Sequence, residues 1–206
     1  MMSGKILESD FFKRDTVEVA KSLIGKKIIR NISGNFFCAK IVETEAYLGL
    51  SDRACHSYGG KITDRNKILY LPGGHIYVYL IYGMYDLLNI VTRDEDHPEA
   101  VLIRGVEPLD NFDGIAKNRF GKSYDDISAY QRKNLTNGPG KLSKGLGIDR
   151  SFNGKILSED YLYIGEGEEV IEKDLVITKR IGIDYAGEDA KLPLRFCLRD
   201  NPYVSR

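Results

Sequence analysis

The pattern of apolar and polar positions predicts a helix followed by a long β-hairpin in the first quarter of the chain. Apolar residues recur at helical spacing before Gly25, which predicts a helix from about Thr16 to Leu23. The segment after Gly25 instead alternates apolar and polar residues on both sides of a turn at residues 33–35. We therefore expect a hairpin whose second strand covers Phe36 to Tyr47.

The rest of the chain predicts further short strands and a group of helices. Residues 48–75 are rich in loop-forming residues, and a short helix is expected after Ser51-Asp52. Two segments have strand composition, IYVYLIYGMYDLLNIVTR, with Gly83 inside it, and AVLIRGVEPL. Residues 111–122 and 123–148 predict helices, the second interrupted by GPG. The C-terminal segments YLYIGEG, DLVITKRIGIDYAG and PLRFCLRD predict short strands with tight turns.

These elements together predict an α+β fold. We expect residues 1–206 to form a single compact domain with a curved, largely antiparallel β-sheet, flanking helices and a protruding β-hairpin. The composition agrees with a globular protein, since 42% of the residues are hydrophobic and 29% are charged.

Composition also bears on where the protein works. The sequence contains no run of eighteen apolar residues, so we expect no membrane-spanning helix and no membrane partner. The first residues lack the apolar core of a signal peptide. Three widely spaced cysteines, an odd number, favour free thiols in a reducing compartment. We therefore expect a cytoplasmic protein.

Charge is balanced over the whole chain but not locally. The sequence has 30 basic and 30 acidic residues, so the basic surplus of many nucleic-acid-binding proteins is missing. Residues 117–144 nevertheless carry seven basic and two acidic side chains, whereas residues 159–174 carry seven acidic and one basic. A local positive field can attract an anion. On charge alone, two ordinary solvated faces are the simpler interpretation.

The stretch HIYVYLIYGMYD, residues 75–86, places four tyrosines within twelve positions. Tyr77 and Tyr79 lie two residues apart and would share one face of a strand. If Gly83 reverses the chain, Tyr82 and Met84 stand at a projecting tip, where an exposed aromatic side chain would be suited to wedge into a base stack. Either strand tyrosine could then stack on an extruded base. Half-buried tyrosines on an ordinary strand explain the same pattern.

Two carboxylates stand out in the predicted second strand, within IVETEAYLG. Glu43 and Glu45 would have Cα atoms about 6.6 Å apart on the same face of a regular strand. They would repel each other unless one is paired with a basic group or has a raised pKa. A carboxylate among apolar and aromatic residues is a candidate general base. A salt bridge to an arginine is the alternative.

An ordered set of motifs makes a family resemblance specific. IVETEAYLG is followed by ACHS at 54–57, by YVYLIYGMY, LIRGVEPL and NGPGKL, and then by RIGIDYAG and PLRF. From about residue 20 to residue 205 the chain resembles the alkyladenine (3-methyladenine) DNA glycosylase family. The resemblance implies a monomer that binds double-stranded DNA containing an alkylated or deaminated purine and flips the damaged base. Water then cleaves the N-glycosidic bond, which leaves an abasic site for base excision repair.

The resemblance also assigns roles to individual residues. Glu45 matches the residue that activates water, and Arg104 matches the arginine that helps to hold that water. Glu43 is then expected to be structural and paired with an arginine. The positions that match the base-binding pocket are Tyr47, His56, Tyr79, Asn89 and Ile181. The resemblance gives Asn89 the role of discouraging guanine by clashing with its amino group, and Ile181 the role of offering a main-chain carbonyl to the water.

Three further positions are expected to contact the DNA outside the pocket. Tyr82 matches the intercalating tyrosine, with Met84 beside it, and Lys141 in NGPGKL is expected to contact the phosphate backbone. A solvated lysine in a turn is an equally good interpretation of Lys141. Should the chain be bacterial, DNA binding would associate it with the nucleoid.

No metal or cofactor is expected. The three histidines and three cysteines fit no zinc-ligand spacing, and the sequence has no CxxC pair. A neutral His56 that hydrogen-bonds a base is the better interpretation. Since the expected hydrolysis needs no lysine, we expect no Schiff base and no strand cleavage.

Two other functions use the same residues. A non-catalytic protein that binds alkylated or single-stranded nucleic acid would need the aromatic side chains but not Glu45. A nucleosidase would need the carboxylate but not the basic stretch 117–144. The sequence leaves open the range of lesions, any general acid and the preferred opposite base.

Overall fold

The sheet is organised around one long strand, β2. The computed structural model describes residues 5–205. In it β1 (Lys27–Ile32) and β2 (Asn35–Tyr47) form the expected hairpin. The first part of β2 pairs with β1, and its second part lies between β5 (Glu99–Pro108) and β8 (Arg195–Leu198). An irregularity in the β2–β5 register near residue 42 marks this change of partners, because a bulge bends and twists its strand.

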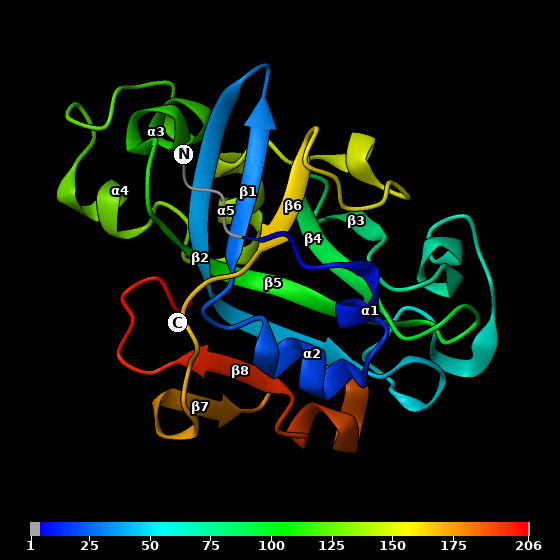
Figure 1. Cartoon of the computed structure of the whole chain (residues 1–206). Coiled ribbons are helices and arrows are strands. Elements are labelled where there is room, and N and C mark those ends of the chain that lie inside the picture. The colour runs from blue at the N-terminus through cyan, green and yellow to red at the C-terminus, as the bar shows by residue number, and fades with distance from the viewer. Residues whose placement is uncertain (1–4, 206) are drawn as a thin grey trace.

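All the strand pairs of the sheet are antiparallel. The order of the main path is β3 (Ile76–Ile81), β4 (Tyr85–Thr92), β5, β2, β1 and β6 (Leu162–Gly165). Beside it, β7 (Leu175–Thr178) pairs with β8. The strands curl into half of a barrel (Figure 1). The expected α+β domain with a curved antiparallel sheet is therefore confirmed.

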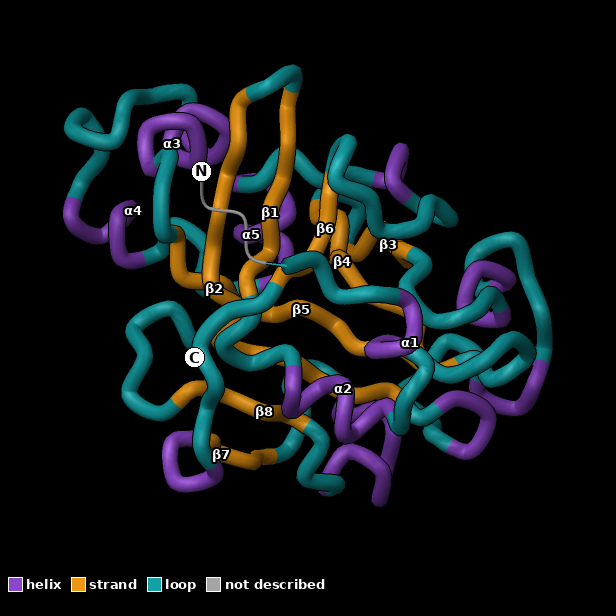
Figure 2. Tube along the Cα trace, viewed as in Figure 1, coloured by secondary structure: helices purple, strands orange, loops and turns teal. Residues whose placement is uncertain are grey.

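Short helices cover the sheet and connect its strands (Figure 2). The α-helices are α1 (Ser9–Phe12), α2 (Thr16–Ser22), α3 (Phe112–Phe120), α4 (Ala129–Lys133) and α5 (Pro139–Gly145). The 3₁₀ segments are Gly49–Ser51, Tyr58–Gly60, Lys67–Tyr70, Arg150–Phe152, Glu172–Asp174 and Asp184–Lys191. The side chain of Asp15 caps α2 by accepting from the amides of Val17 and Glu18, which fixes the start of the predicted helix.

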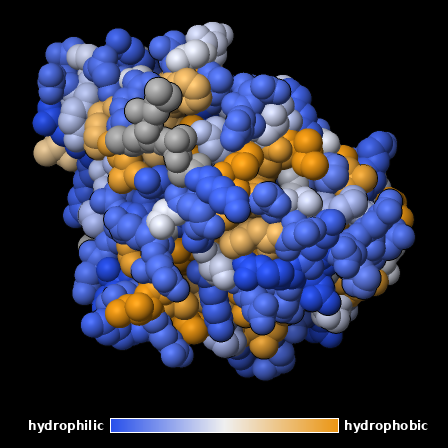
Figure 3. All heavy atoms as spheres, viewed as in Figure 1, coloured by the Kyte–Doolittle hydropathy of each residue, from blue (hydrophilic) through white to orange (hydrophobic). Residues whose placement is uncertain are grey.

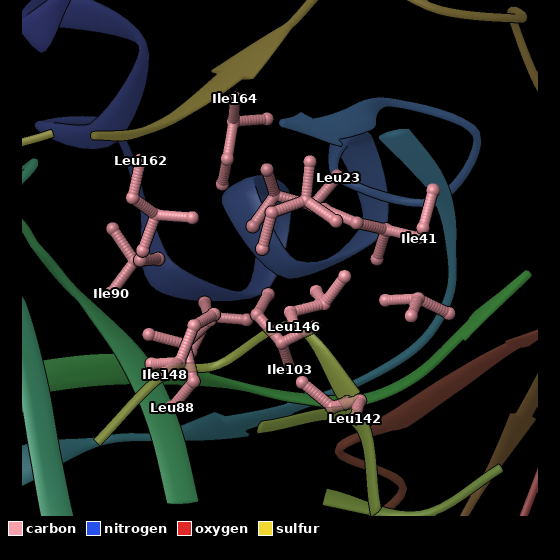
Figure 4. Close-up of a cluster of buried hydrophobic side chains, with 14 of the residues drawn as sticks. Leu23, Ile41, Leu88, Ile90, Ile103, Leu142, Leu146, Ile148, Leu162 and Ile164 are labelled. Carbon is pink, nitrogen blue, oxygen red and sulfur yellow. The ribbon is translucent and has the colours of Figure 1, made fainter. Parts of the chain in front are cut away.

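One apolar cluster joins the sheet to α2 and α5 (Figure 4). Leu23 follows α2, Ile41 and Ile103 come from neighbouring strands, and Leu142 and Leu146 come from α5 and the residue after it. Alternate residues of β3 and β4 complete the cluster. Because successive side chains of a strand point to opposite faces, the side chains on the other face of β3, β4 and β5 do not belong to this cluster.

The hairpin of β3 and β4 ends in a three-residue turn. Ile81 pairs with Tyr85, and Tyr82, Gly83 and Met84 form the turn. Tyr82 and Gly83 both have positive φ angles, 53° and 70°, so the chain reverses as the glycine suggested. The side chain of Tyr82 is 80% exposed and that of Met84 is 68% exposed. The protruding tip expected from the sequence is therefore present.

Two local predictions need correction. The helix expected after Ser51-Asp52 does not form; instead a 3₁₀ turn, Gly49–Ser51, ends just before Asp52. The Asp52 carboxylate accepts from the backbone amides of Leu48 and Ala54 and pairs with an arginine, so it stabilises a turn and does not cap a helix. In residues 123–148 the GPG motif starts α5, because Pro139 occupies its first turn, where no amide hydrogen is needed.

The surface is mixed in character. The face in Figure 3 is mainly hydrophilic, with separate hydrophobic patches. Among the described residues, no helix has the length and apolar character needed to cross a membrane. All three cysteines, Cys38, Cys55 and Cys197, are buried free thiols.

Candidate active site

One face of three adjacent strands forms the floor of a cavity of about 660 Å³. Every second residue contributes to this floor, namely Tyr77, Tyr79 and Ile81 of β3, Tyr85, Leu87 and Asn89 of β4, and Ala100, Leu102 and Arg104 of β5. The loop from residue 48 to 75, at the right in Figure 1, closes one side, and residues 138–141 and 181–185 close others. The volume lies in the range of small-molecule sites.

A single row of directly paired residues crosses this floor. Tyr77 pairs with Asn89, Asn89 with Leu102, and Leu102 with Glu45. Directly opposed residues of antiparallel strands point to the same face. The sheet therefore places Glu45 in line with the residues of the cavity floor, although strands β4 and β5 separate it from the tyrosine.

Glu45 is buried at the edge of the cavity. Its Oε1 accepts a hydrogen bond of 2.8 Å from the Ile181 amide, and its Oε2 accepts one of 2.8 Å from the Tyr47 hydroxyl. Arg104 Nη1 lies 3.3 Å from Oε1. Burial raises the pKa of Glu45, and Arg104 and the two hydrogen bonds offset part of that effect. An ionised carboxylate has about four lone-pair sites, so Oε2 keeps room for another donor.

Glu43 occupies the same face but takes no part in lining the cavity. Its carboxylate accepts from Arg104 at 3.2 Å, Arg195 at 2.6 Å, and both the amide and hydroxyl of Ser205 at 2.7 and 2.8 Å. Gly105 lies opposite, where a Cβ would come within 3.1 Å of a Glu43 oxygen. Glu43 is thus fully engaged and links Arg104 to the C-terminal segment.

A buried ion pair supports the wall beside Glu45. Arg180 donates two hydrogen bonds to Asp52, and both side chains are shielded from solvent. The guanidinium carbon lies 4.8 Å from the ring centroid of Tyr47. Arg180 immediately precedes Ile181, whose amide contacts Glu45. The ion pair therefore fixes the Tyr47 ring, whose hydroxyl donates to Glu45, and the Ile181 amide, which donates to the same carboxylate.

Two tyrosines of the cavity floor, Tyr77 and Tyr79, pack with His56 and form the aromatic wall of the cavity. Tyr79 lies edge-on to His56 with ring centroids 4.5 Å apart, and 5.4 Å from Tyr77. His56 Nδ1 is 2.8 Å from the Tyr77 hydroxyl, and Arg65 Nη2 is 3.2 Å from Nε2. Because the guanidinium can only donate, His56 Nε2 is the acceptor and Nδ1 carries the proton. Burial, with a smaller contribution from Arg65, lowers the pKa of His56 to about 4.

The low pKa of His56 predicts a pH-dependent stability. An unfolded histidine ionises near pH 6.5, so the unfolded chain binds this proton first as the pH falls. The contribution of His56 to the free energy of unfolding is then complete above pH 6.5 and is lost towards pH 4, by up to about 3 kcal/mol. Urea unfolding at pH 7 and pH 4.5 should show a smaller loss in His56→Gln than in the original protein. Equal losses would contradict the assignment.

The residues that line the cavity include Tyr82 of the hairpin tip and the basic side chains of Arg119 and Lys141. The Lys141 ammonium donates to the side-chain oxygens of Asn134 and Asn137, both at 2.9 Å. Asp86, near the tip, pairs with Arg150 at 3.2 Å. This ion pair neutralises the acidic group that stands closest to the tip.

The structure brings most of the residues singled out in the sequence to one place. Around the cavity lie Tyr47, His56, Tyr79, Tyr82, Asn89, Arg104, Lys141 and Ile181, with Glu45 directly behind its wall. Met84 lies at the hairpin tip but not among the lining residues. Ile181 contacts Glu45 through its amide, whereas the sequence suggested its carbonyl as a ligand of water.

The sequence did not indicate the roles of three residues of the site, Asp52, Arg65 and Arg180. It indicates Asp52 only as part of a helix start and Arg180 only as part of the motif RIGIDYAG, because their ion pair joins distant segments, and Arg65 lies in an irregular loop. In residues 5–205 no group of three or more His, Cys, Asp or Glu side chains is arranged to hold a metal ion.

The site thus combines a cavity lined by tyrosines, a buried carboxylate behind its wall and an exposed aromatic hairpin tip. Known proteins with a similar sequence identify the family. The sequence model of the methylpurine-DNA glycosylase (MPG) family matches residues 10–202, so the chain belongs to this family. The resemblance to alkyladenine DNA glycosylases is thereby confirmed. The family indicates a DNA repair enzyme that hydrolyses N-glycosyl bonds.

Bacterial relatives cover almost the whole chain. A Clostridium novyi (strain NT) protein is 50% identical over 202 residues, which is 98% of this chain and 99% of that protein. A Clostridioides difficile (strain 630) protein is 50% identical over 199 residues, 92% and 98% of the two chains. One from Clostridium perfringens (strain 13 / Type A) is 49% identical over 203 residues, 97% and 98%. All three carry the provisional name 3-methyladenine DNA glycosylase.

Proposed function

We propose that this protein is a monofunctional, monomeric DNA glycosylase that removes alkylated and deaminated purines from double-stranded DNA. The observation that carries the proposal is the position of Glu45, a buried carboxylate next to an aromatic cavity large enough for a purine. In the proposed complex the damaged nucleotide leaves the duplex and its base enters the cavity between Tyr47 and the wall of His56 and Tyr79. Family membership supports the substrate class.

The proposed chemistry uses Glu45 as a general base. Glu45 takes a proton from water, the water oxygen bonds to the sugar C1′, and the N-glycosidic bond breaks with its electron pair going to the purine. Arg104 supports the ionised form of the carboxylate. An alkyl group on N3 or N7 makes the purine cationic, so that it leaves as a neutral base. Neutral purines such as hypoxanthine need a proton from a donor.

The test of the proposed function is base release. Duplexes that contain 3-methyladenine, 7-methylguanine or hypoxanthine should release the free base, detected by chromatography, and leave an abasic strand. The free nucleosides should react far more slowly than the duplexes, because the hairpin tip and the basic side chains of the cavity can act only on a polymer. Equal rates on nucleoside and duplex would favour a nucleosidase. Binding to lesion DNA without any release would favour a non-catalytic reader.

We propose that the enzyme does not cleave the DNA strand, and the contacts of Lys141 support this. Its ammonium is held by two amide oxygens in the cavity wall, and the hydrolytic mechanism does not use it. We expect that borohydride traps no covalent adduct between the enzyme and lesion DNA, and that the product strand stays intact until it is treated with alkali. A trapped adduct that Lys141→Gln abolishes would instead assign a Schiff base to this lysine.

Tyr82 is proposed to fill the space that the flipped nucleotide leaves. Its ring is 80% exposed at a tight turn, so Tyr82→Ala should leave the fold unchanged. Since stacking on a base contributes about 1–3 kcal/mol, the Kd for lesion DNA should rise about tenfold, and that for undamaged DNA much less. Fluorescence anisotropy on both duplexes measures this difference.

Tyr130→Ala is the matched control for the hairpin tip. Tyr130 is 75% exposed on α4 and does not line the cavity, so its removal should change neither affinity. Equal losses of lesion and undamaged binding in the Tyr82 variant would contradict a wedge.

A further inference from the structure

Arg65 occupies a position in the cavity that the family chemistry described above does not explain. Its side chain lines the cavity, with Nη2 at 3.2 Å from His56 Nε2 and the guanidinium carbon 5.2 Å from the ring centroid of Tyr79. It therefore contacts two side chains of the proposed base-binding wall at once. Among residues 5–205, the ion pairs do not include Arg65.

The loop that carries Arg65 is anchored to the same wall. The neighbouring Asn66 is buried, and its side-chain nitrogen donates to the carbonyl oxygens of His56 at 2.9 Å and Lys61 at 2.8 Å. Its side-chain oxygen accepts from the amide of Thr63 at 2.7 Å. The backbone at Arg65 is thus held against His56, which keeps the guanidinium, although the residue is exposed, among the groups that line the cavity.

The charges around the cavity make Arg65 important for the choice of base. Four basic side chains and no acidic one are among the lining residues of the described chain, namely Arg65, Arg104, Arg119 and Lys141. Glu45, behind the cavity wall, is already paired with Arg104. Arg65, which takes part in none of the ion pairs of residues 5–205, thus adds positive charge beside the ring of Tyr79. A cationic purine would be repelled by this charge and would compete with it for the electron-rich ring.

A neutral purine with acceptors on its outer edge would meet the opposite situation. Hypoxanthine presents O6 and N7, the two acceptors that an arginine guanidinium contacts in guanine. A purine methylated at N7 has lost one of these acceptors and gained a charge. A guanidinium beside the bound base therefore distinguishes the two kinds of damaged base through both charge and hydrogen bonding.

We infer that Arg65 is a specificity-determining residue, which favours neutral 6-oxopurines over cationic alkylpurines in this cavity. The inference rests on the proposed function, because it concerns which base the same site accepts. The role of Arg65 differs from those of Glu45 and Arg104. Arg65 changes the ratio of the rates at which two bases are released, and not the hydrolysis that both substrates share.

The test compares two duplexes of the same sequence, one with hypoxanthine and one with 7-methylguanine. Single-turnover base release is measured for the original protein and for Arg65→Gln, which removes the charge but keeps a polar side chain. We expect hypoxanthine release to fall about tenfold while 7-methylguanine release stays constant or rises. Arg65→Lys keeps the charge but loses the planar pair of donors. Its rate of hypoxanthine release should lie between those of the original protein and Arg65→Gln.

Lys61→Gln provides the matched control. Lys61 is exposed on the same loop and does not line the cavity, so this change removes one charge without altering the site. The ratio of the two release rates should stay as in the original protein. A second readout is the titration of His56 by NMR, where the pKa should rise in Arg65→Gln because Arg65 is one of the groups that lower it.

The outcomes separate this inference from the proposed function. If the original protein releases neither base, the proposed function fails. If it releases both and Arg65→Gln slows both equally, or changes neither, the inference about Arg65 is wrong while the glycosylase function stands. Thermal unfolding of each variant checks that the fold is retained.

Discussion

Glu45→Gln is expected to slow base release by at least about a hundredfold while lesion DNA still binds. Glutamine has the shape of glutamate, and its oxygen can still accept a hydrogen bond from the Ile181 amide or the Tyr47 hydroxyl. It cannot take a proton from water, and a general base typically contributes 10²–10⁴-fold to the rate. Single-turnover release and anisotropy with the same 7-methylguanine duplex measure the two quantities separately.

The control for this variant is Glu169→Gln, a change at an exposed residue of the acidic stretch 159–174. It should leave both release and binding unchanged. If Glu45→Gln releases the base at the original rate, Glu45 is not the general base. If the variant loses lesion binding as well, the carboxylate supports the cavity itself, and Asn or Asp at the same position would separate the two effects.

Asp52→Ala is expected to lower the free energy of unfolding by about 3–5 kcal/mol, because it leaves the buried guanidinium of Arg180 without a counter-ion. For a chain of this length, about 2–4 °C per kcal/mol implies a Tm lower by roughly 6–20 °C. The alanine also removes the acceptor for two backbone amides, those of Leu48 and Ala54. Urea unfolding and calorimetry measure the two quantities.

The same substitution should also impair catalysis. Arg180 packs on the Tyr47 ring and precedes Ile181. Loss of its ion pair with Asp52 therefore disturbs both hydrogen-bond donors to Glu45. Asp64→Ala breaks a salt bridge with Lys67 at a fully exposed position and is expected to leave Tm and base release unchanged. A Tm of Asp52→Ala equal to that of the original protein would show that solvent reaches Arg180.

The sequence was most informative where the structure is local. The tyrosines of β3 and the carboxylates of β2 follow the period of two that places them on one face, and Gly83 marks the turn that exposes Tyr82. These features depend on neighbours within a few residues. The family motifs then added the roles of residues such as Asn89, whose pairing with Leu102 and Tyr77 across the sheet no local pattern indicates.

What the sequence did not predict are contacts between distant segments. Asp52 and Arg180 are 128 positions apart, and Glu43 and Ser205 are 162 apart. The Ser51-Asp52 pair has the local signature of a helix start, but the gain from an ion pair with Arg180 and from two backbone amides favoured a turn. Arg65 lies in an irregular loop, where its direction depends on how Asn66 anchors the chain.

The burial of the three cysteines has a consequence for how they react with electrophiles. Burial raises the pKa of Cys38 to about 11 and that of Cys197 to about 12, and it also raises the pKa of Cys55 beside the cavity. Only the thiolate reacts readily with an electrophile. At neutral pH these sulfur atoms are protonated and shielded, so the reagents that damage guanine and adenine would leave this repair enzyme's own side-chain sulfhydryls largely unmodified.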